Sequence, residues 1–413
     1  MNSVDLVRQY GSPLYVYNLA MVRTAYQKLK HALPDPSQIY YSLKANAHPR
    51  LVAQLIALGC GCDICSTGEL QTVLQCDGYN VEHMLYTGPG KTRREILFAL
   101  QSGIQRFSIE SLHDMIKIVE CAEALSTHVE LVLRINPESS IAGAGLTMSG
   151  IASQFGIDAQ AIRSNRHIYQ DSPYATFIGS HIYIGSNTRN IEKLLQTLIL
   201  AIKQSALNAQ DQGSEPLFLD LGGGFCHEFA RPAELPDYTS IKAPLEATLD
   251  DFFPQWRAGK PRVIFEAGRY LTAACGSLIC SVEDIKQSKG QVFVVLDTGI
   301  NHLGGMAGLK RLPSIGPVFT LSKEHETSER WENVSIVGPL CTPLDCLARL
   351  VDIPKVEVGD VLTIPNVGAY GLTASLLAFL SRDAPVEVVL DGDTICHVSQ
   401  LHVERKISGG FLC

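Results

Sequence analysis

The sequence predicts an α/β protein: a (β/α)8 TIM-like barrel with a C-terminal β-rich domain that also takes in the N-terminal strand. Strand-like apolar runs alternate with amphipathic helical runs, and eight such strand-like runs precede residue 271. After Leu271 the runs become short and β-rich, with Gly, Pro and Asp between them. The predicted domains are 20–271 for the barrel, and 1–19 with 272–413 for the β-rich domain.

The strand-like runs of the barrel are short, apolar segments bounded by turn residues. They are 38–44, 61–65, 84–87, 106–110, 129–135, 177–184, 217–221 and 263–266. Helical patterns separate them. HPRLVAQLIALGC places Leu51 and Leu55 on one face, and STGELQTVLQC opens with Ser66 and Glu69 at capping-box spacing. The early SPLYVYN segment is also strand-like, and we expect it to pair into the β-rich domain.

Composition and charge exclude several classes of function. Lys and Arg total 34 and Asp and Glu total 42, so the net charge of −8 argues against a nucleic-acid-binding surface. No apolar run reaches about 18 residues, and the N-terminus does not resemble a signal peptide. We therefore expect a cytoplasmic enzyme without a membrane partner, whose 12 cysteines are mostly reduced. The GCGCDIC segment lacks the second Cys or His cluster of a zinc site, so no metal is predicted.

A lysine ends the first strand-like run of the barrel. In YYSLKANAH, Lys44 stands where an apolar strand leaves the core, and an unpaired buried charge costs several kcal/mol. Two explanations are open at this point. The lysine is either a solvated strand end, or a group that is neutral or bound as a Schiff base to a carbonyl cofactor.

The carboxyl ends of the strands form the catalytic face of a (β/α)8 barrel. The residues that the sequence places there are Lys44, Asp63, Ser66, Glu110, Arg134, Asn136, His181, Tyr183, Ser186, Gly222, Gly223, Gly224, Glu266, Gly268 and Arg269. Each alone has a plainer explanation, such as an ion pair or a tight turn. A lysine, a carboxylate, a histidine ring and a glycine nest for phosphate together describe a pyridoxal 5'-phosphate site.

Seven motifs resemble, in the same order, those of the fold-type III pyridoxal-phosphate decarboxylases, the diaminopimelate and ornithine decarboxylase family. They are YSLKAN, GCDICSTGEL, HIYIGSN, DLGGGF, EAGRY, GPLCTPLD and NVGAYG. The resemblance covers nearly the whole chain, from SPLYVYN to GAYG. It implies the same two-domain fold, pyridoxal phosphate as cofactor, an amino-acid substrate and a homodimer with active sites shared across the interface.

The resemblance also implies a role for each matching residue. Lys44 is expected to hold the cofactor aldehyde as a Schiff base, His181 to stack on the pyridine ring, and Glu266 to pair with the ring nitrogen. Cys341 is expected to be the proton donor and Asp345 to bind the substrate amine, both from the neighbouring subunit. The other residues expected to bind the cofactor are Asp63, Ser186, Gly222, Gly223, Gly224, Gly268, Arg269 and Tyr370, and Tyr370 is also expected to bind substrate.

The acidic partner at position 266 favours decarboxylation over racemisation. Decarboxylation leaves an electron pair at Cα, and a pyridine ring absorbs it best when a nearby carboxylate keeps the ring nitrogen protonated. Racemases on the related alanine-racemase scaffold place an arginine against that nitrogen instead. A non-catalytic cofactor-binding barrel would lack the C-terminal β domain and its Cys–Asp motif, both of which this chain has.

The motifs that depart from the family pattern lie on the substrate side. The usual CESGD is CTPLD here, and LDTGINHLGG and GAYGLTASLLAFLS also differ from the diaminopimelate decarboxylase pattern. These differences favour an amino-acid moiety within a larger conjugate, such as a siderophore intermediate or a carrier-bound aminoacyl group. The alternatives are diaminopimelate decarboxylase proper, in lysine biosynthesis, and an amino-acid racemase.

Overall fold

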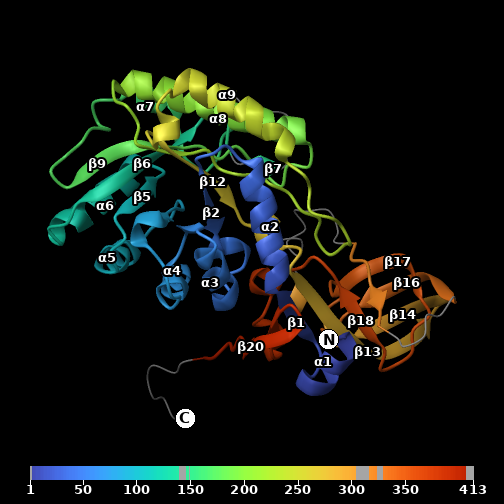
Figure 1. The fold of residues 1–413 in the computed structure, drawn as a ribbon. Coiled ribbons are helices and arrows are strands. Elements are labelled where there is room, and N and C mark those ends of the chain that lie inside the picture. Colours follow the sequence, from blue (N-terminus) through green and yellow to red (C-terminus); the bar gives the residue numbers. More distant parts are fainter. Residues whose placement is uncertain (1, 139–145, 148, 304–315, 323–328, 406–413) are drawn as a thin grey trace, which may run out of the picture. The chain divides into compact units, whose positions relative to one another are not determined.

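The computed structural model describes residues 2–138, 146–147, 149–303, 316–322 and 329–405. The chain forms two compact units. One contains residues 22–227 and 235–272, and the other contains 1–21, 228–234 and 273–413. Figure 1 shows the first with helices and parallel strands and the second mainly with strands. None of the described helices is long and apolar enough to cross a bilayer.

The first unit is a closed barrel of eight parallel strands, as the sequence predicts. Their order around the barrel is β5-β4-β3-β2-β12-β11-β9-β6, and β5 pairs with β6 to close it. The strands are β2 (Gln38–Ser42), β3 (Gly61–Ile64), β4 (Met84–Tyr86), β5 (Arg106–Ile109), β6 (Val129–Asn136), β9 (Ala175–His181), β11 (Phe218–Asp220) and β12 (Arg262–Ala267). A short strand, β8 (Ile157–Asp158), pairs in parallel with the end of β6. Strand β7 (Leu146–Thr147) pairs with β10 (Gly185–Ser186).

Helices surround the barrel strands (Figure 1). They are α2 (Leu19–Ala32), α3 (Pro49–Ala57), α4 (Thr67–Leu74), α5 (Arg93–Gln101), α6 (Leu112–Ala124), α7 (Ala159–Ser164), α8 (Ile191–Gln212), α9 (Lys242–Phe252) and α10 (Arg269–Thr272). Helix α3 buries Leu51, Val52 and Leu55, the apolar face that the sequence indicates. At the start of α4, Ser66 Oγ accepts the Glu69 N–H, whereas the Glu69 carboxylate accepts the Cys65 N–H instead of closing the box on Ser66.

The second unit is a β-rich sheet in the order β17-β16-β14-β13-β1-β19-β20, with β18 beside β13 and β15 beside β18. The strands are β1 (Leu14–Asn18), β13 (Gly276–Ser288), β14 (Gln291–Leu296), β15 (Thr320–Leu321), β16 (Arg330–Val337), β17 (Cys346–Pro354), β18 (Val361–Ile364), β19 (Val386–Asp391) and β20 (Thr394–Gln400). Two short helices, α1 (Ser3–Tyr10) and α11 (Ile300–Leu303), belong to this unit.

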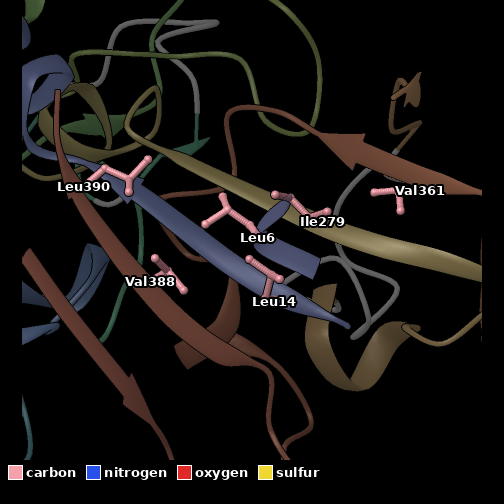
Figure 2. Close-up of a cluster of buried hydrophobic side chains, with 6 residues drawn as sticks. All are labelled: Leu6, Leu14, Ile279, Val361, Val388 and Leu390. Carbon is pink, nitrogen blue, oxygen red and sulfur yellow. The ribbon is translucent and has the colours of Figure 1, made fainter. Parts of the chain in front are cut away.

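The N-terminal strand joins this second sheet, as predicted. Strand β1 pairs antiparallel with β13 and parallel with β19. A buried apolar cluster holds these elements together, and Figure 2 shows its members: Leu6, Leu14, Ile279, Val361, Val388 and Leu390. Leu6 comes from α1, a helix that the sequence analysis did not predict. Burying these side chains stabilises the attachment of α1 and β1 to the sheet, because each buried Leu, Ile or Val contributes about 1.5–3 kcal/mol.

Candidate active site

Lys44 lies immediately after β2, in a single 3-10 turn formed by Leu43–Ala45. Its ammonium Nζ is 3.0 Å from Asp63 Oδ2 at the end of β3, and 4.0 Å from Glu266 Oε2 on β12. The Lys44 side chain is 44% exposed, whereas those two carboxylates are 0% and 3% exposed. The lysine is therefore a solvent-accessible amine at the carboxyl end of the barrel, paired with two buried acids.

A hydroxyl group fixes the carboxylate of Asp63. Thr87, which follows β4, donates its Oγ1 hydrogen to Asp63 Oδ1 at 2.6 Å. With one oxygen on Thr87 and the other on Lys44, the carboxylate holds the lysine in one place. Sequence reasoning missed Thr87, because a lone threonine after a strand carries no motif. A feature that could have identified it is its position: Thr87 directly follows β4, the strand that pairs in parallel with β3, which contains Asp63.

His181 and Glu266 form the buried polar centre of the barrel end. His181 Nδ1 is 2.9 Å from the Ser108 hydroxyl on β5, which orients the ring. Its Nε2 lies 3.2 Å from Glu266 Oε1 and 3.8 Å from Asp220 Oδ2. The sequence predicted His181 and Glu266 as site residues but gave no role to Ser108 or Asp220.

Two neighbouring carboxylates in this centre have opposite pKa shifts. Burial alone would raise the pKa of Glu266, but the charges of Lys44 and His181 hold it well below its usual range. Burial and the adjacent charge of Glu266 raise the pKa of Asp220 well above its usual value. Within this pair, the surroundings therefore favour the charged form of Glu266 and disfavour that of Asp220.

Other polar residues predicted at the strand ends form structural contacts. Arg134 Nη1 donates to Glu110 Oε1 at 2.7 Å, and both side chains are buried. The amide of Asn136 accepts the Gly150 N–H at 2.5 Å and donates to Asp158 Oδ1 at 2.9 Å, which fixes the segment after β6. These residues therefore form an ion pair and loop contacts, the plainer explanation of their position at the strand ends.

The glycines after β11 and β12 are required by close packing. A Cβ atom on Gly223 would come within 2.1 Å of the Glu266 carbonyl oxygen, and one on Gly222 within 2.7 Å of the Ile182 carbonyl oxygen. Gly224 and Gly268 are similarly crowded, at 2.8 Å and 2.9 Å from their nearest atoms. Arg269 begins α10, directly after this turn.

The barrel end fits pyridoxal phosphate on two observations. Glu266 Oε1 is buried without an aligned hydrogen-bond partner within the part of the chain that the structure describes, as a partner for a protonated pyridine nitrogen requires. The buried N–H groups of Gly223 and Gly224 also have no acceptor among those residues, and such groups are suited to bind phosphate oxygens. The possible metal-ligand atoms of His181, Asp220 and Glu266 also lie within 4.8 Å of one another, close enough to share one metal ion.

The β-rich unit contains the three remaining predicted site residues. Cys341 is exposed and follows β16. Asp345, for which the resemblance implies binding of the substrate amine, is buried, and both of its carboxylate oxygens accept backbone N–H groups. Tyr370 has a φ angle of +57°, a strained conformation for a non-glycine residue that is common at functional sites. Ser186 lies in the barrel unit, in β10 beside β7.

Comparison with known proteins identifies relatives of the whole chain. A model of the pyridoxal-dependent decarboxylase family, pyridoxal binding domain, matches residues 19–273. The L-glutamyl acyl-carrier-protein decarboxylase of Niallia circulans is 30% identical over 389 residues, which are 93% of this chain and 90% of that protein. The diaminopimelate decarboxylase of Vibrio cholerae is 30% identical over 400 residues, 96% of this chain and 91% of that protein.

A solved structure shares both units. The crystal structure of diaminopimelate decarboxylase from Helicobacter pylori complexed with L-lysine is 26% identical, with a TM-score of 0.83, and the match covers 96% of this chain and 95% of that chain. The family model spans more than half of the 413 residues and includes Lys44, His181 and Glu266. This chain belongs to the pyridoxal-dependent decarboxylase family, and it is a pyridoxal-phosphate-dependent amino-acid decarboxylase.

Proposed function

We propose that this decarboxylase removes the α-carboxyl group from an amino-acid moiety carried on a larger molecule, a carrier-bound aminoacyl group or a siderophore intermediate. The observation that carries the proposal is the loop at residues 341–344. Its sequence, CTPL, has no charged side chain where diaminopimelate decarboxylases have a glutamate. The Thr342 hydroxyl accepts the Leu344 N–H at 3.3 Å, and Leu344 is 59% exposed. This loop offers an apolar surface and no ionic partner for a distal charged group.

In this proposal the predicted site residues have the following roles. Lys44 holds the cofactor aldehyde, and Asp63 keeps the lysine amine in position. Glu266 carries the negative charge beside the pyridine nitrogen, His181 covers the ring, and Gly222, Gly223, Gly224 and Gly268, with Ser186, Arg269 and Tyr370, surround the phosphate. When bound, pyridoxal phosphate supplies the conjugated electron sink of the reaction. The Cys341 thiol supplies the proton that replaces the lost carboxyl group.

A carrier-protein substrate is supported by the relative from Niallia circulans, whose name states that it acts on L-glutamyl acyl-carrier protein. Identity alone does not choose the substrate, because the diaminopimelate decarboxylase of Vibrio cholerae is equally similar at 30%. The absence of charge in the 341–344 loop is what separates the two candidates. Diaminopimelate decarboxylation is therefore the competing function.

The test is carbon dioxide release by the purified holoenzyme from a panel of substrates. The panel contains meso-diaminopimelate, L-lysine, L-ornithine, L-arginine and L-glutamate as free amino acids, and citrate-linked and carrier-protein-linked amino acids as conjugates. We expect kcat/KM for one conjugate to exceed that for any free amino acid by on the order of 10²-fold, because contacts remote from the reacting carbon contribute binding energy to the transition state. Brisk turnover of a free amino acid would overturn the proposal.

We also propose a cytoplasmic homodimer in which Cys341 completes the site of the partner subunit. The support is a set of exposed apolar side chains in the same unit as Cys341: Leu344, Leu376, Phe379 and Leu380 are all at least 40% exposed. Arg382 Nη2 donates to the Pro339 carbonyl at 3.3 Å, which joins the segment around Phe379 to the Cys341 loop. An exposed apolar surface of this kind indicates an interface.

Mixing two variants of strongly reduced activity tests the shared site. Lys44→Ala and Cys341→Ala subunits, unfolded and refolded together in equal amounts, form mixed dimers in which one of the two sites has both native residues. Random assortment makes about half of the dimers mixed, so we expect about one quarter of wild-type activity. If each site were built from one subunit, the mixture would keep only the low activity of the two variants. Light scattering after size-exclusion chromatography gives the oligomeric state in parallel.

A further inference from the structure

The carboxylate of Asp345 joins two turns of the β-rich unit. Its Oδ1 accepts the Ile300 N–H at 2.9 Å, and its Oδ2 accepts the Leu340 N–H at 2.8 Å. Leu340 immediately precedes Cys341, and Ile300 begins α11. The side chain is 4% exposed, so these backbone contacts replace water around the charge.

Two glycines make the space that this carboxylate occupies. A Cβ atom on Gly299 would come within 2.2 Å of Asp345 Oδ1, and one on Gly338 within 2.3 Å of Oδ2. The backbone of Asp345 closes the same loop, because its N–H donates to the Thr342 carbonyl at 3.1 Å and its carbonyl accepts the Gly338 N–H at 3.2 Å. The peptide planes beside Gly299 and Gly338 therefore fill the space in which a ligand would approach the carboxylate.

We infer that Asp345 is a positioning residue, which holds the 338–345 loop and thereby places the Cys341 thiol, and that it does not bind the substrate amine. The loop leaves β16 at Val337 and enters β17 at Cys346, and Asp345 is its last residue. Cys341 stands in the middle of it, exposed, with the anchored Leu340 N–H one residue away. The inference rests on the proposed function only where it names Cys341 as the proton donor.

The main variant is Asp345→Asn, with Asp360→Asn as the matched control. The Asp360 carboxylate also accepts a backbone N–H, that of Glu357 at 2.6 Å, but in an exposed turn of the same unit. The amide that replaces the Asp345 carboxylate keeps one acceptor oxygen and turns an NH2 group toward the other N–H. With the panel substrate that releases carbon dioxide fastest, we expect kcat to fall on the order of 10- to 10²-fold with KM changed less than about threefold. We expect the control to match wild type.

Combining Asp345→Asn with Cys341→Ala shows whether Asp345 affects turnover through the Cys341 thiol. If Asp345 acts through the thiol, Asp345→Asn lowers kcat in the wild-type background and has almost no effect in the Cys341→Ala background. A residue that binds the amine would instead raise KM by at least about tenfold in both backgrounds, with kcat little changed. That second result would overturn the inference.

Two further measurements need no turnover. The rate at which iodoacetamide alkylates Cys341, followed by peptide mass spectrometry, should change at least about threefold in Asp345→Asn and stay constant in Asp360→Asn. In the wild-type holoenzyme, peptides that report the Ile300 and Leu340 amides should exchange hydrogen slowly without substrate. Unchanged alkylation or fast exchange would overturn the inference, even where Asp345→Asn fails to fold. Unaltered turnover in Cys341→Ala would instead reject the proton-donor role, and these two measurements would still decide the role of Asp345.

Discussion

The barrel end and the Cys341 loop stabilise buried carboxylates in different ways. In the barrel, Asp63 and Glu266 lie within 4.0 Å of the Lys44 ammonium, and His181 lies 3.2 Å from Glu266, so charged side chains from several strands compensate one another. In the loop, Asp345 is surrounded by backbone N–H groups and glycines of its own unit. A change of one barrel side chain alters the protonation of its neighbours, whereas a change at Asp345 alters the course of the backbone.

We interpret this difference as a division of roles, in which the barrel end binds the cofactor and the Cys341 loop determines the substrate. The barrel residues match the family motifs and come from the ends of regular strands, where we propose that the cofactor binds. The loop keeps the aspartate that shapes it but has the uncharged CTPL sequence at its tip. We infer that in this family the substrate can change on the loop while the barrel end remains the same.

The largest expected effect on turnover is that of replacing Lys44, and the buried Lys91 of the same unit provides the comparison. Lys44→Ala should abolish the cofactor absorbance near about 420 nm and lower turnover by at least about 10³-fold, because the amine that holds the cofactor is lost. Lys91 is buried and donates to Asp114 Oδ2 at 2.6 Å, so Lys91→Met removes the nearest cation from a buried carboxylate and leaves it with Lys117 at 3.8 Å. It should cost about 3–5 kcal/mol of stability.

Visible absorbance and denaturant unfolding separate the two lysine variants. We expect Lys44→Ala to be colourless and close to wild type in stability, and Lys91→Met to be unstable but to keep the cofactor absorbance at low temperature. The opposite pattern would show that the buried ion pair, and not the exposed amine, holds the cofactor.

The next effect distinguishes the two adjacent carboxylates of the barrel. Glu266→Gln removes the charge beside the pyridine nitrogen and should lower kcat by on the order of 10²-fold. Asp220→Asn should lower it less than about tenfold, because burial and the neighbouring Glu266 raise the pKa of Asp220 and so disfavour a second negative charge there. Steady-state kinetics between pH 6 and pH 9 give both values, and equal losses in the two variants would contradict the assignment of the charge to Glu266.

A buried glutamate in the β-rich unit provides a test of pH-dependent stability. Burial raises the pKa of Glu387 from 4.5 to about 7, although the Tyr17 hydroxyl donates to it at 3.1 Å. Because the folded-state pKa is the higher one, this group's contribution is fully present below pH 4.5 and is lost as the pH rises through about 7. The wild-type protein should therefore lose stability in this window, and Glu387→Gln should not.

Urea unfolding at pH 5.0 and pH 8.5 measures this difference. Between the two pH values, Glu387→Gln should gain about 2 kcal/mol of unfolding free energy relative to wild type. The exposed Glu332→Gln is the control, with no expected change between the two pH values. A gain of the same size in the control would mean that overall charge, and not the buried Glu387, produces the pH dependence.

The smallest effect is expected from metal removal. His181, Asp220 and Glu266 lie close enough to hold a metal ion. If their role is to support the pyridine ring, dialysis against EDTA should leave the absorbance and the rate of carbon dioxide release unchanged. Loss of activity that is restored by zinc but not by pyridoxal phosphate would reassign this centre.

Much of the fold and of the cofactor site could be predicted from the sequence, because the strands are regular and their carboxyl ends meet at one face. Thr87, Ser108 and Asp220 could not be assigned, because their function depends on the strand beside them and a single Ser, Thr or Asp carries no pattern. The resemblance implies that Asp345 binds the substrate amine, because it follows Cys341 in a family motif. Whether a carboxylate faces a ligand or its own backbone depends on the path of the loop, which the motif does not specify.

The central claim is that the amine of Lys44 holds the cofactor, and borohydride reduction of the purified holoenzyme tests it most directly. Reduction fixes the cofactor permanently to the amine that binds it, and peptide mass spectrometry then identifies that residue. We expect a phosphopyridoxyl group on Lys44 and on no other lysine. A modified lysine elsewhere, or an unmodified peptide 38–49 in protein that was yellow before reduction, would contradict it.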